Sequence, residues 1–327
     1  MAALRTRVQA LGAADCPPPE IREAREREWE LILSIGDYDV PGPGNGFLDN
    51  GLEEEYVVSS PHMQRLIRAT LEAPVTDEIY ISGGFGTIAA LGDNRNDAIV
   101  PAGGTSGIVY GAPAPSGSTG IATPFGISGE AESDLTIFGF GVGYDLSDAV
   151  SVFADYSHRD HDYDASISGS GTSGGFDFVF EQEREQSIDE DLYEVGLKAE
   201  HALRLADKFS LELSGAAGVY RRESELRSTE HNTANFGPPA DQDFTTVIDE
   251  DDGGWGAHGQ AGAAFSWNFT RAVAIKFGGS VDYRSNVATI FNPVSGDEVL
   301  AGLTTTLDTH HAWIWQAGVG IAVALGR

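Results

Sequence analysis

The chain has 327 residues, with 50 acidic and 20 basic side chains and a formal charge of -30 at pH 7. This balance argues strongly against a nucleic-acid partner, because phosphate binding needs clustered Lys and Arg. The one cysteine, Cys16, excludes an intrachain disulfide framework and any multi-cysteine metal site. No stretch approaches the roughly 18 to 20 apolar residues of a transmembrane helix, and no signal-peptide pattern is present.

Residues 1–76 differ in pattern from the rest and predict a partly helical N-terminal extension. Pro17–Gly36 places prolines before alternating acids and bases and an apolar end, which predicts a helix from about residue 20 to residue 34. Ser60–Pro74 predicts a second helix, with Ser60 as its N-cap. We expect this extension to lie in the periplasm or to pack against the domain that follows.

From Thr76 onward the hydrophobic period changes to two, as in "FGFGVGYDLSDAVSVFADYSHRD" (Phe138 to Asp160). Eight segments show it, starting near residues 79, 138, 150, 193, 209, 261, 273 and 313. Each is long enough for the roughly 9 to 11 residues of a tilted transmembrane strand. A further short strand at Ser106–Pro113 would raise the count, and ten strands is the alternative number.

The connections between these segments alternate in length. Tight turns are predicted at 145–148, 205–208 and 268–271, and long polar loops near 91–130, 160–188, 222–254 and 286–308. Bacterial outer-membrane barrels have short periplasmic turns and long external loops. The pattern therefore predicts an all-β, eight-stranded antiparallel up-and-down transmembrane barrel over residues 77–327.

The two faces of the predicted strands differ in chemistry. One face is apolar, with aromatic rings toward its ends where they would meet the lipid–water boundary: Tyr144, Tyr156, Trp267, Tyr283, Trp313 and Trp315. The other face carries small residues and sparse charges, which we assign to the lumen: Glu194, Lys198, Glu200, Glu212, Lys276, Asp282 and Arg284. A soluble β-sandwich is the alternative, but its strands would be shorter, about 5 to 6 residues.

Three hairpins, 138–160, 193–222 and 263–284, resemble those of the small outer-membrane β-barrel superfamily, the OmpA/Opa-like group. The resemblance covers about residues 77 to 327 and implies a bacterial outer-membrane location, with a signal peptide already removed. The chain departs from that group at its end, where Leu325-Gly326-Arg327 replaces the usual terminal aromatic residue.

Two clusters that contain His or acidic residues are candidates for cation binding. His158 and His161 with Asp160 and Asp162 could hold a divalent cation at the external loops, although a solvated rim is the stronger interpretation. No other cofactor is expected. The acids of Val247–Gly254 resemble a calcium loop only in charge, because the EF-hand spacing is absent.

We also consider an outer-membrane enzyme. Ser214, His258 and Asp282 could face the lumen, but no G-x-S-x-G motif is present and nothing in the sequence brings the three together. We therefore expect that the protein is not an enzyme.

The predicted lumen charges favour a plugged barrel, because an eight-stranded interior is only wide enough for side chains and buried charges must pair. The many lumen glycines leave space and keep a narrow porin for small solutes or ions as the alternative function. Our first hypothesis is a structural or surface-interaction protein that acts through long acidic external loops. A lipid-modifying enzyme is the third. The expected partners are membrane lipid, lipopolysaccharide and other surface or periplasmic proteins, and no nucleic acid.

Overall fold

A computed structural model of the chain describes residues 29–39, 44–49, 55–59, 63–88, 94–100, 106–110, 117–121, 125–173, 176–235, 242–292 and 304–326. All regular structure in these ranges is β-strand. None of the described residues forms a helix that is long and apolar enough to span a membrane.

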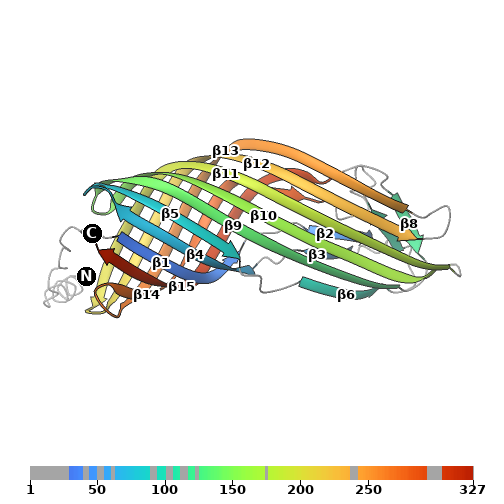
Figure 1. Cartoon of the computed structure of the whole chain (residues 1–327), viewed down its shortest axis with the longest axis horizontal. Coiled ribbons are helices and arrows are strands. Elements are labelled where there is room, and N and C mark those ends of the chain that lie inside the picture. Colours follow the sequence, from blue (N-terminus) through green and yellow to red (C-terminus); the bar gives the residue numbers. More distant parts are fainter. Residues whose placement is uncertain are drawn as a thin grey trace, which may run out of the picture.

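The strands close into an antiparallel ring. In ring order they are β1, β4, β5, β9, β10, β11, β12, β13, β14 and β15, and β15 pairs back onto β1 from Trp29↔Gly326 to Tyr38↔Gln316. The bounds are Trp29–Asp39, Met63–Pro74, Ile79–Ile88, Phe125–Ser147, Val150–Ser173, Phe176–Ala206, Phe209–Asn235, Gln242–Asn268, Val273–Phe291 and Thr306–Gly326. Figure 1 shows these strands tilted around a common axis. Closure pairs the main-chain groups of every neighbour, which lipid demands of a spanning sheet.

The prediction of eight strands was wrong: the sheet has eleven strands, β6 (Asn94–Val100) pairs only with β9, and the remaining ten form the ring. The two additional ring strands, β1 and β4, come from the segment that we expected to be helical. Residues 29–34 and 63–74 are strand, and residues 20–28 and 60–62 of the two predicted helices lie outside the described residues, as does Cys16. Nothing described supports a helical extension.

The local sequence of β4 is compatible with a helix as well as with a strand, and this explains why a helix was predicted there. In "MQRLIRATLEAP", apolar residues at 66, 67, 69 and 71 satisfy helical spacing as well as alternation. The alternation holds in the structure: Ile67 and Leu71 are exposed on the outer face, whereas Leu66 is buried. Tertiary contacts make this segment a strand, because β4 pairs with β1 on one side and with β5 on the other.

Four tight turns lie at one end of the barrel, at residues 75–78, 148–149, 207–208 and 269–272. The turn at residues 75–78 was not predicted, and it has the same hydrogen-bond pattern as the turn at residues 269–272. Thr76 Oγ1 accepts the amides of residues 78 and 79 at 3.2 and 3.0 Å, and Thr270 Oγ1 accepts those of residues 272 and 273 at 3.1 and 3.0 Å. A Thr side chain that bonds its own backbone two or three residues on is a turn-forming device.

The opposite ends of the strands extend far beyond the thickness of a bilayer. β9 to β13 have 23, 24, 31, 27 and 27 residues. At about 3.3 Å per residue, β11 alone is roughly 100 Å long. The predicted polar loops near 160–188 and 222–254 are therefore largely strand. We call the part of β9–β13 that continues past the apolar outer face the extramembrane wall.

Smaller strands accompany this end of the molecule. β2 (Gly44–Asp49), β3 (Glu55–Ser59), β7 (Ser106–Tyr110) and β8 (Gly117–Ile121) form a separate sheet in the order β3-β2-β7-β8. In Figure 1, β6 and β8 lie at the end away from the tight turns. The suspected extra strand at Ser106–Pro113 thus exists as β7 over residues 106–110, but it is outside the ring.

The outer ends of β14 and β15 leave the ring and turn inward. Their pairing is interrupted between Arg284 and Val287, where Asn286 adopts a positive φ of 62°. Beyond this bulge, Ile290 joins a buried cluster with Tyr163, Ile188 and Leu226 on the inner side of the extramembrane wall. A second cluster below it contains Leu66, Ile88, Leu135, Val287, Ala312 and Ile314. The interior is therefore filled with side chains at this level.

Candidate functional site

The outer face next to the tight turns is a continuous apolar belt. Phe140, Trp313 and Trp315 are 64%, 61% and 59% exposed, and the large apolar side chains of neighbouring strands are exposed with them. A contiguous apolar surface that spans neighbouring strands marks contact with a membrane or a partner. Its upper limit is a row of aromatic side chains that includes Tyr156, Tyr193 and Trp255.

The structure places the predicted boundary aromatics around this belt. Tyr144, Trp267, Trp313 and Trp315 are exposed, and Tyr156 and Tyr283 are partly exposed. Tyr283 lies 4.9 Å from Trp313 between ring centroids, and Tyr156 lies 5.3 Å from Tyr193. Such aromatic pairs suit a boundary that is apolar on one side and wet on the other.

Near the tight turns, the lumen holds two groups of ion pairs. Lys276 Nζ lies 3.2 Å from Glu212 Oε2 and 3.3 Å from Glu30 Oε1. Lys198 Nζ lies 2.8 Å from Glu200 Oε1. The predicted lumen charges of this level are thus brought into contact, with Glu30 added from the unpredicted strand β1.

Close to the level of the aromatic row, the lumen holds a further group of charges. His258 Nδ1 contacts Glu194 Oε1, and its Nε2 lies 2.9 Å from Asp282 Oδ1. Arg284 Nε lies 3.1 Å from Asp282 Oδ2, and its Nη2 lies 3.8 Å from Glu194 Oε2. Buried charges persist only when they are paired, and here each of the two carboxylates lies close to both His258 and Arg284.

Several lumen glycines lie directly against side chains of other strands. A Cβ at Gly143 would come within 2.0 Å of the Tyr80 ring, and one at Gly141 within 1.7 Å of Asp155 Oδ1. A Cβ at Gly256 would meet the Tyr220 ring at 2.3 Å. Glycine in a barrel strand marks such close approach, and an aromatic ring often covers it. These glycines therefore make room for inward side chains of other strands.

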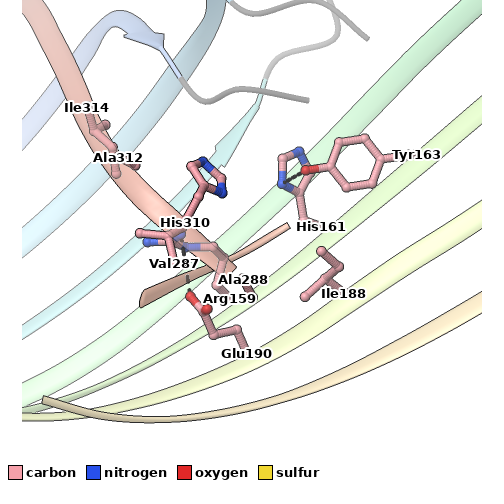
Figure 2. Close-up of a pocket in the computed structure, with 10 residues that line it drawn as sticks. All are labelled: Arg159, His161, Tyr163, Ile188, Glu190, Val287, Ala288, His310, Ala312 and Ile314. Carbon is pink, nitrogen blue, oxygen red and sulfur yellow. Dashed lines mark hydrogen bonds and ion pairs between the residues drawn. The ribbon is translucent and has the colours of Figure 1, made fainter. Parts of the chain in front are cut away.

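Above the belt, a small interior pocket lies between polar and apolar side chains, as Figure 2 shows. His161 lies against Tyr163, with Nδ1 2.6 Å from the phenol oxygen, and its Nε2 is 3.2 Å from Ser133 Oγ. Arg159 Nη1 is 3.5 Å from Glu190 Oε1. The cavity volume of about 20 Å³ accommodates roughly one water molecule. A pocket of this size is too small for a substrate.

The pocket keeps His161 neutral. Burial, followed by the charge of Arg159, lowers the pKa of His161 to about 3. Both of its ring nitrogens are engaged by hydroxyl groups, so this imidazole is a structural hydrogen-bonding group.

The four residues of the predicted metal site do not converge. Side chains alternate along β10, so the buried His161 points into the interior while Asp162 is exposed on the outer face. His158 instead bonds Asp191 Oδ1 through Nδ1 at 3.0 Å. In the part of the chain that the structure describes, no group of three or more His, Cys, Asp or Glu side chains is arranged to hold a metal ion.

The outer face of the extramembrane wall is strongly acidic. Strand register places carboxylates directly opposite one another across β9–β13: Asp134↔Asp162, Glu132↔Asp164, Asp160↔Asp189, Asp164↔Glu185, Asp189↔Glu225 and Glu225↔Asp251. Partial burial and then the charges of its acidic neighbours raise the pKa of Asp162, and the same two causes raise that of Asp164. Like charges opposite one another destabilise a sheet, so this surface favours the approach of cations.

The suspected Ser–His–Asp group is not assembled. His258 and Asp282 are in contact. Ser214, however, pairs with Gly262, four residues along β13 from His258 and therefore roughly 13 Å away. The two nitrogens of His258 face carboxylates, and neither meets this hydroxyl group.

Several buried polar residues escaped the sequence analysis. Arg222 is fully buried and pairs with Asp252, and Arg184 pairs with Glu230 further along the wall. All lie in segments that we expected to be loops. The available signal was the alternation of inward and outward positions, which continues through "RRESELRSTEHN" although few of its members are apolar.

No family model matches the sequence, and no curated protein matches it. Several solved structures align with the chain at low identity. The outer-membrane protease OmpT from Escherichia coli aligns at 10% identity over 94% of this chain and 100% of that chain, with a TM-score of 0.45. The translocator domain of the autotransporter NalP from Neisseria meningitidis aligns at 11% identity over 98% and 96%, with a TM-score of 0.38. A FadL homologue from Pseudomonas aeruginosa aligns at 8% identity over 92% and 90%, with a TM-score of 0.27.

These structures are outer-membrane β-barrels, and at such identities the likeness concerns the fold alone. They do not support the narrower OmpA/Opa-like assignment. The expectation that the chain is not an enzyme is corrected as well, because one of the aligned barrels is a protease. The barrel fold by itself therefore gives no ground for excluding catalysis.

Proposed function

We propose that this protein is a bacterial outer-membrane barrel with a closed lumen, and that it presents the extramembrane wall as a contact surface for cationic partners. The observation that carries the proposal is the acidic outer face of β9–β13, which begins directly above the aromatic row of the apolar belt. A rigid sheet holds these charges at fixed spacing, whereas loops would leave them mobile. Opposite charge on a partner then speeds association and selects among partners.

The membrane location is supported by the closed ring and by the exposed apolar belt. Folded barrels of this kind resist SDS at room temperature, so unboiled and boiled samples should migrate differently on a gel. Recovery in the outer-membrane fraction of a Gram-negative host completes the test. A protein that is soluble without detergent would contradict this part of the proposal.

The closed lumen is supported by three filled levels: the Lys276 pairs, the charges around His258, and the clusters near Ile290 and Ile314. We expect planar-bilayer recordings without stable multi-nanosiemens steps. Lys276→Glu would place three acids together and is the variant most suited to loosening the plug. Stable large steps from the unaltered protein would support the narrow-porin alternative instead.

The contact surface is tested with a fluorescent decalysine peptide and detergent-solubilised protein. Replacing Asp162, Asp189 and Asp251 by Asn should weaken binding, and added salt should weaken it further because exposed charges are screened. The matched control replaces Asp77, Asp148 and Asp207 by Asn, since these acids lie at the tight turns on the opposite end. Equal losses from both sets would show that only net charge matters and would overturn the proposed surface.

A further inference from the structure

We propose that the outer edge of β13, above the apolar belt, is a docking site for an extended basic polypeptide segment, which adds to the extramembrane wall as one more strand. The inference rests on the proposed cationic-partner function and specifies how such a partner is held. Its basis is a strand edge that the barrel leaves open.

The edge arises because β13 is much longer than its pairing with β14. The two strands pair from Asn268↔Ala274 to His258↔Arg284, and there the pairing ends. β13 continues to Gln242 and remains paired with β12 throughout. Since β14 turns inward at the Asn286 bulge, no described strand covers the other side of β13 from Thr245 to Gly253. In Figure 1, β13 forms the upper margin of the molecule along this stretch.

Two hydrogen bonds fix the direction of the backbone groups. The Ala257 amide donates to Ser285 Oγ at 2.7 Å, and the Trp255 carbonyl accepts from Asn286 Nδ2 at 3.2 Å. Odd-numbered residues of β13 therefore face the side of β14. Because the direction alternates along an antiparallel strand, the next five odd residues present their N–H and C=O groups to the open side: Gly253, Asp251, Asp249, Val247 and Thr245.

None of these five residues has a backbone partner on that side among the described residues. Each offers one donor and one acceptor in strand geometry. A row of this kind is a template for strand addition, in which main-chain bonds provide affinity and alternate side chains provide selectivity.

The charges beside the edge select a basic segment. Both Asp249 and Asp251 are exposed on the outer face. Asp251 lies opposite Glu225, and Asp249 lies opposite Arg227, whose charge acts on it at longer range than an ion-pair contact. On β12, the neighbouring Glu223 and Glu225 already pair with Arg221 and Arg227. Asp251 is therefore uncompensated, and Asp249 is only partly compensated because Arg227 is already bonded to Glu225. Lys or Arg at alternate positions of an added strand would lie opposite both aspartates.

A second copy of the chain is a poor occupant of this edge. Two barrels in one membrane share an orientation, so a symmetric pair related by an axis along the membrane normal would bring its β13 edges together in parallel. Each acid would then lie beside its own copy, Asp249 near Asp249 and Asp251 near Asp251. Like charges in that arrangement oppose pairing.

The test uses an eleven-residue peptide of alternating Lys and Val, labelled with a fluorophore, and the full chain in detergent. The same peptide with N-methyl groups on alternate residues keeps its charge but loses the donors for strand pairing. We expect the unmodified peptide to bind at least about tenfold more tightly, because several main-chain hydrogen bonds are at stake. Binding should also slow the exchange of the amide hydrogens of residues 249 and 251.

Val247→Pro is the corresponding change in the protein. It removes one N–H from the open side without touching the ladder to β12, a position where strands tolerate proline. The matched control, Val247→Thr, keeps the N–H. We expect Val247→Pro to weaken the unmodified peptide about tenfold and to leave the N-methylated peptide unchanged, with heat-dependent gel migration confirming an intact barrel.

Equal binding of the two peptides, or equal binding by the two Val247 variants, would overturn the edge site and leave the acidic contact surface standing. Binding of neither peptide would overturn both. A peptide of alternating Glu and Val that binds as well as the Lys peptide would refute the selection by charge.

Discussion

Removing Arg184 should strongly destabilise the extramembrane wall. Arg184 Nε donates to Glu230 Oε2 at 2.9 Å, and Gln182 and Asn232 donate to Oε1 at 2.8 and 2.7 Å. Both members of the ion pair are about 5% exposed. Arg184→Met would leave a buried carboxylate without its cation, a loss that costs about 3–5 kcal/mol in proteins.

Hydrogen exchange measures this loss locally. A change of 3 kcal/mol or more corresponds to at least about 100-fold faster exchange, which we expect for the amides of residues 180–190 and 226–234. Arg227→Met is the matched control, because the Arg227–Glu225 pair joins the same region but is exposed. It should leave exchange nearly unchanged, since exposed pairs contribute little.

The pH dependence supplies a second readout. Burial alone would raise the pKa of Glu230, but Arg184 and the donors from Asn232 and Gln182 bring it below its usual value. Its stabilising contribution is therefore present above the unfolded-state pKa and is lost as pH falls through the folded-state pKa. In Arg184→Met burial is no longer offset, so the carboxyl group protonates at higher pH and the difference from the unaltered protein shrinks on acidification. A difference that grows in acid, or a loss no larger than that of Arg227→Met, would refute the reasoning.

Two further predictions concern the interior. The pKa of His161 is about 3 and that of an unfolded His is near 6.5, so between these pH values the unfolded chain binds one more proton than the folded chain. The free energy of unfolding should therefore fall as pH drops through this window, by up to about 1.4 kcal/mol per pH unit. His161→Asn should flatten that slope, and an unchanged slope would contradict the assignment. Gly143→Ala should destabilise the barrel by about 1–3 kcal/mol through overlap with the Tyr80 ring, and Tyr80→Ala in the same chain should relieve the overlap. Gly259→Ala, which meets nothing within 4 Å, is its control, and equal thermal stability of the two Gly variants would argue against a filled lumen.

The hydrophobic alternation predicted the strands that face lipid, because the period of two is a local property that requires no knowledge of partners. It placed Trp313 and Trp315 on an outer face and Glu194 and Asp282 on an inner one. It failed for β1 and β4, where consecutive apolar residues fit two periods at once. It also failed beyond the belt, where polar side chains alternate as regularly as apolar ones but give no hydrophobic signal.

The sequence by itself determined the chemistry of the two barrel faces, the tight turns after β9, β11 and β13, and the acidic character of the outer end, since each depends on neighbouring residues along the chain. Only the tertiary structure decided the number of strands, because a ring closes only when β15 finds β1 across nearly three hundred residues. It likewise decided which charges meet, as for His258 with Glu194, and which strand edge stays open. Such contacts join distant segments through strand register, which a local pattern does not encode.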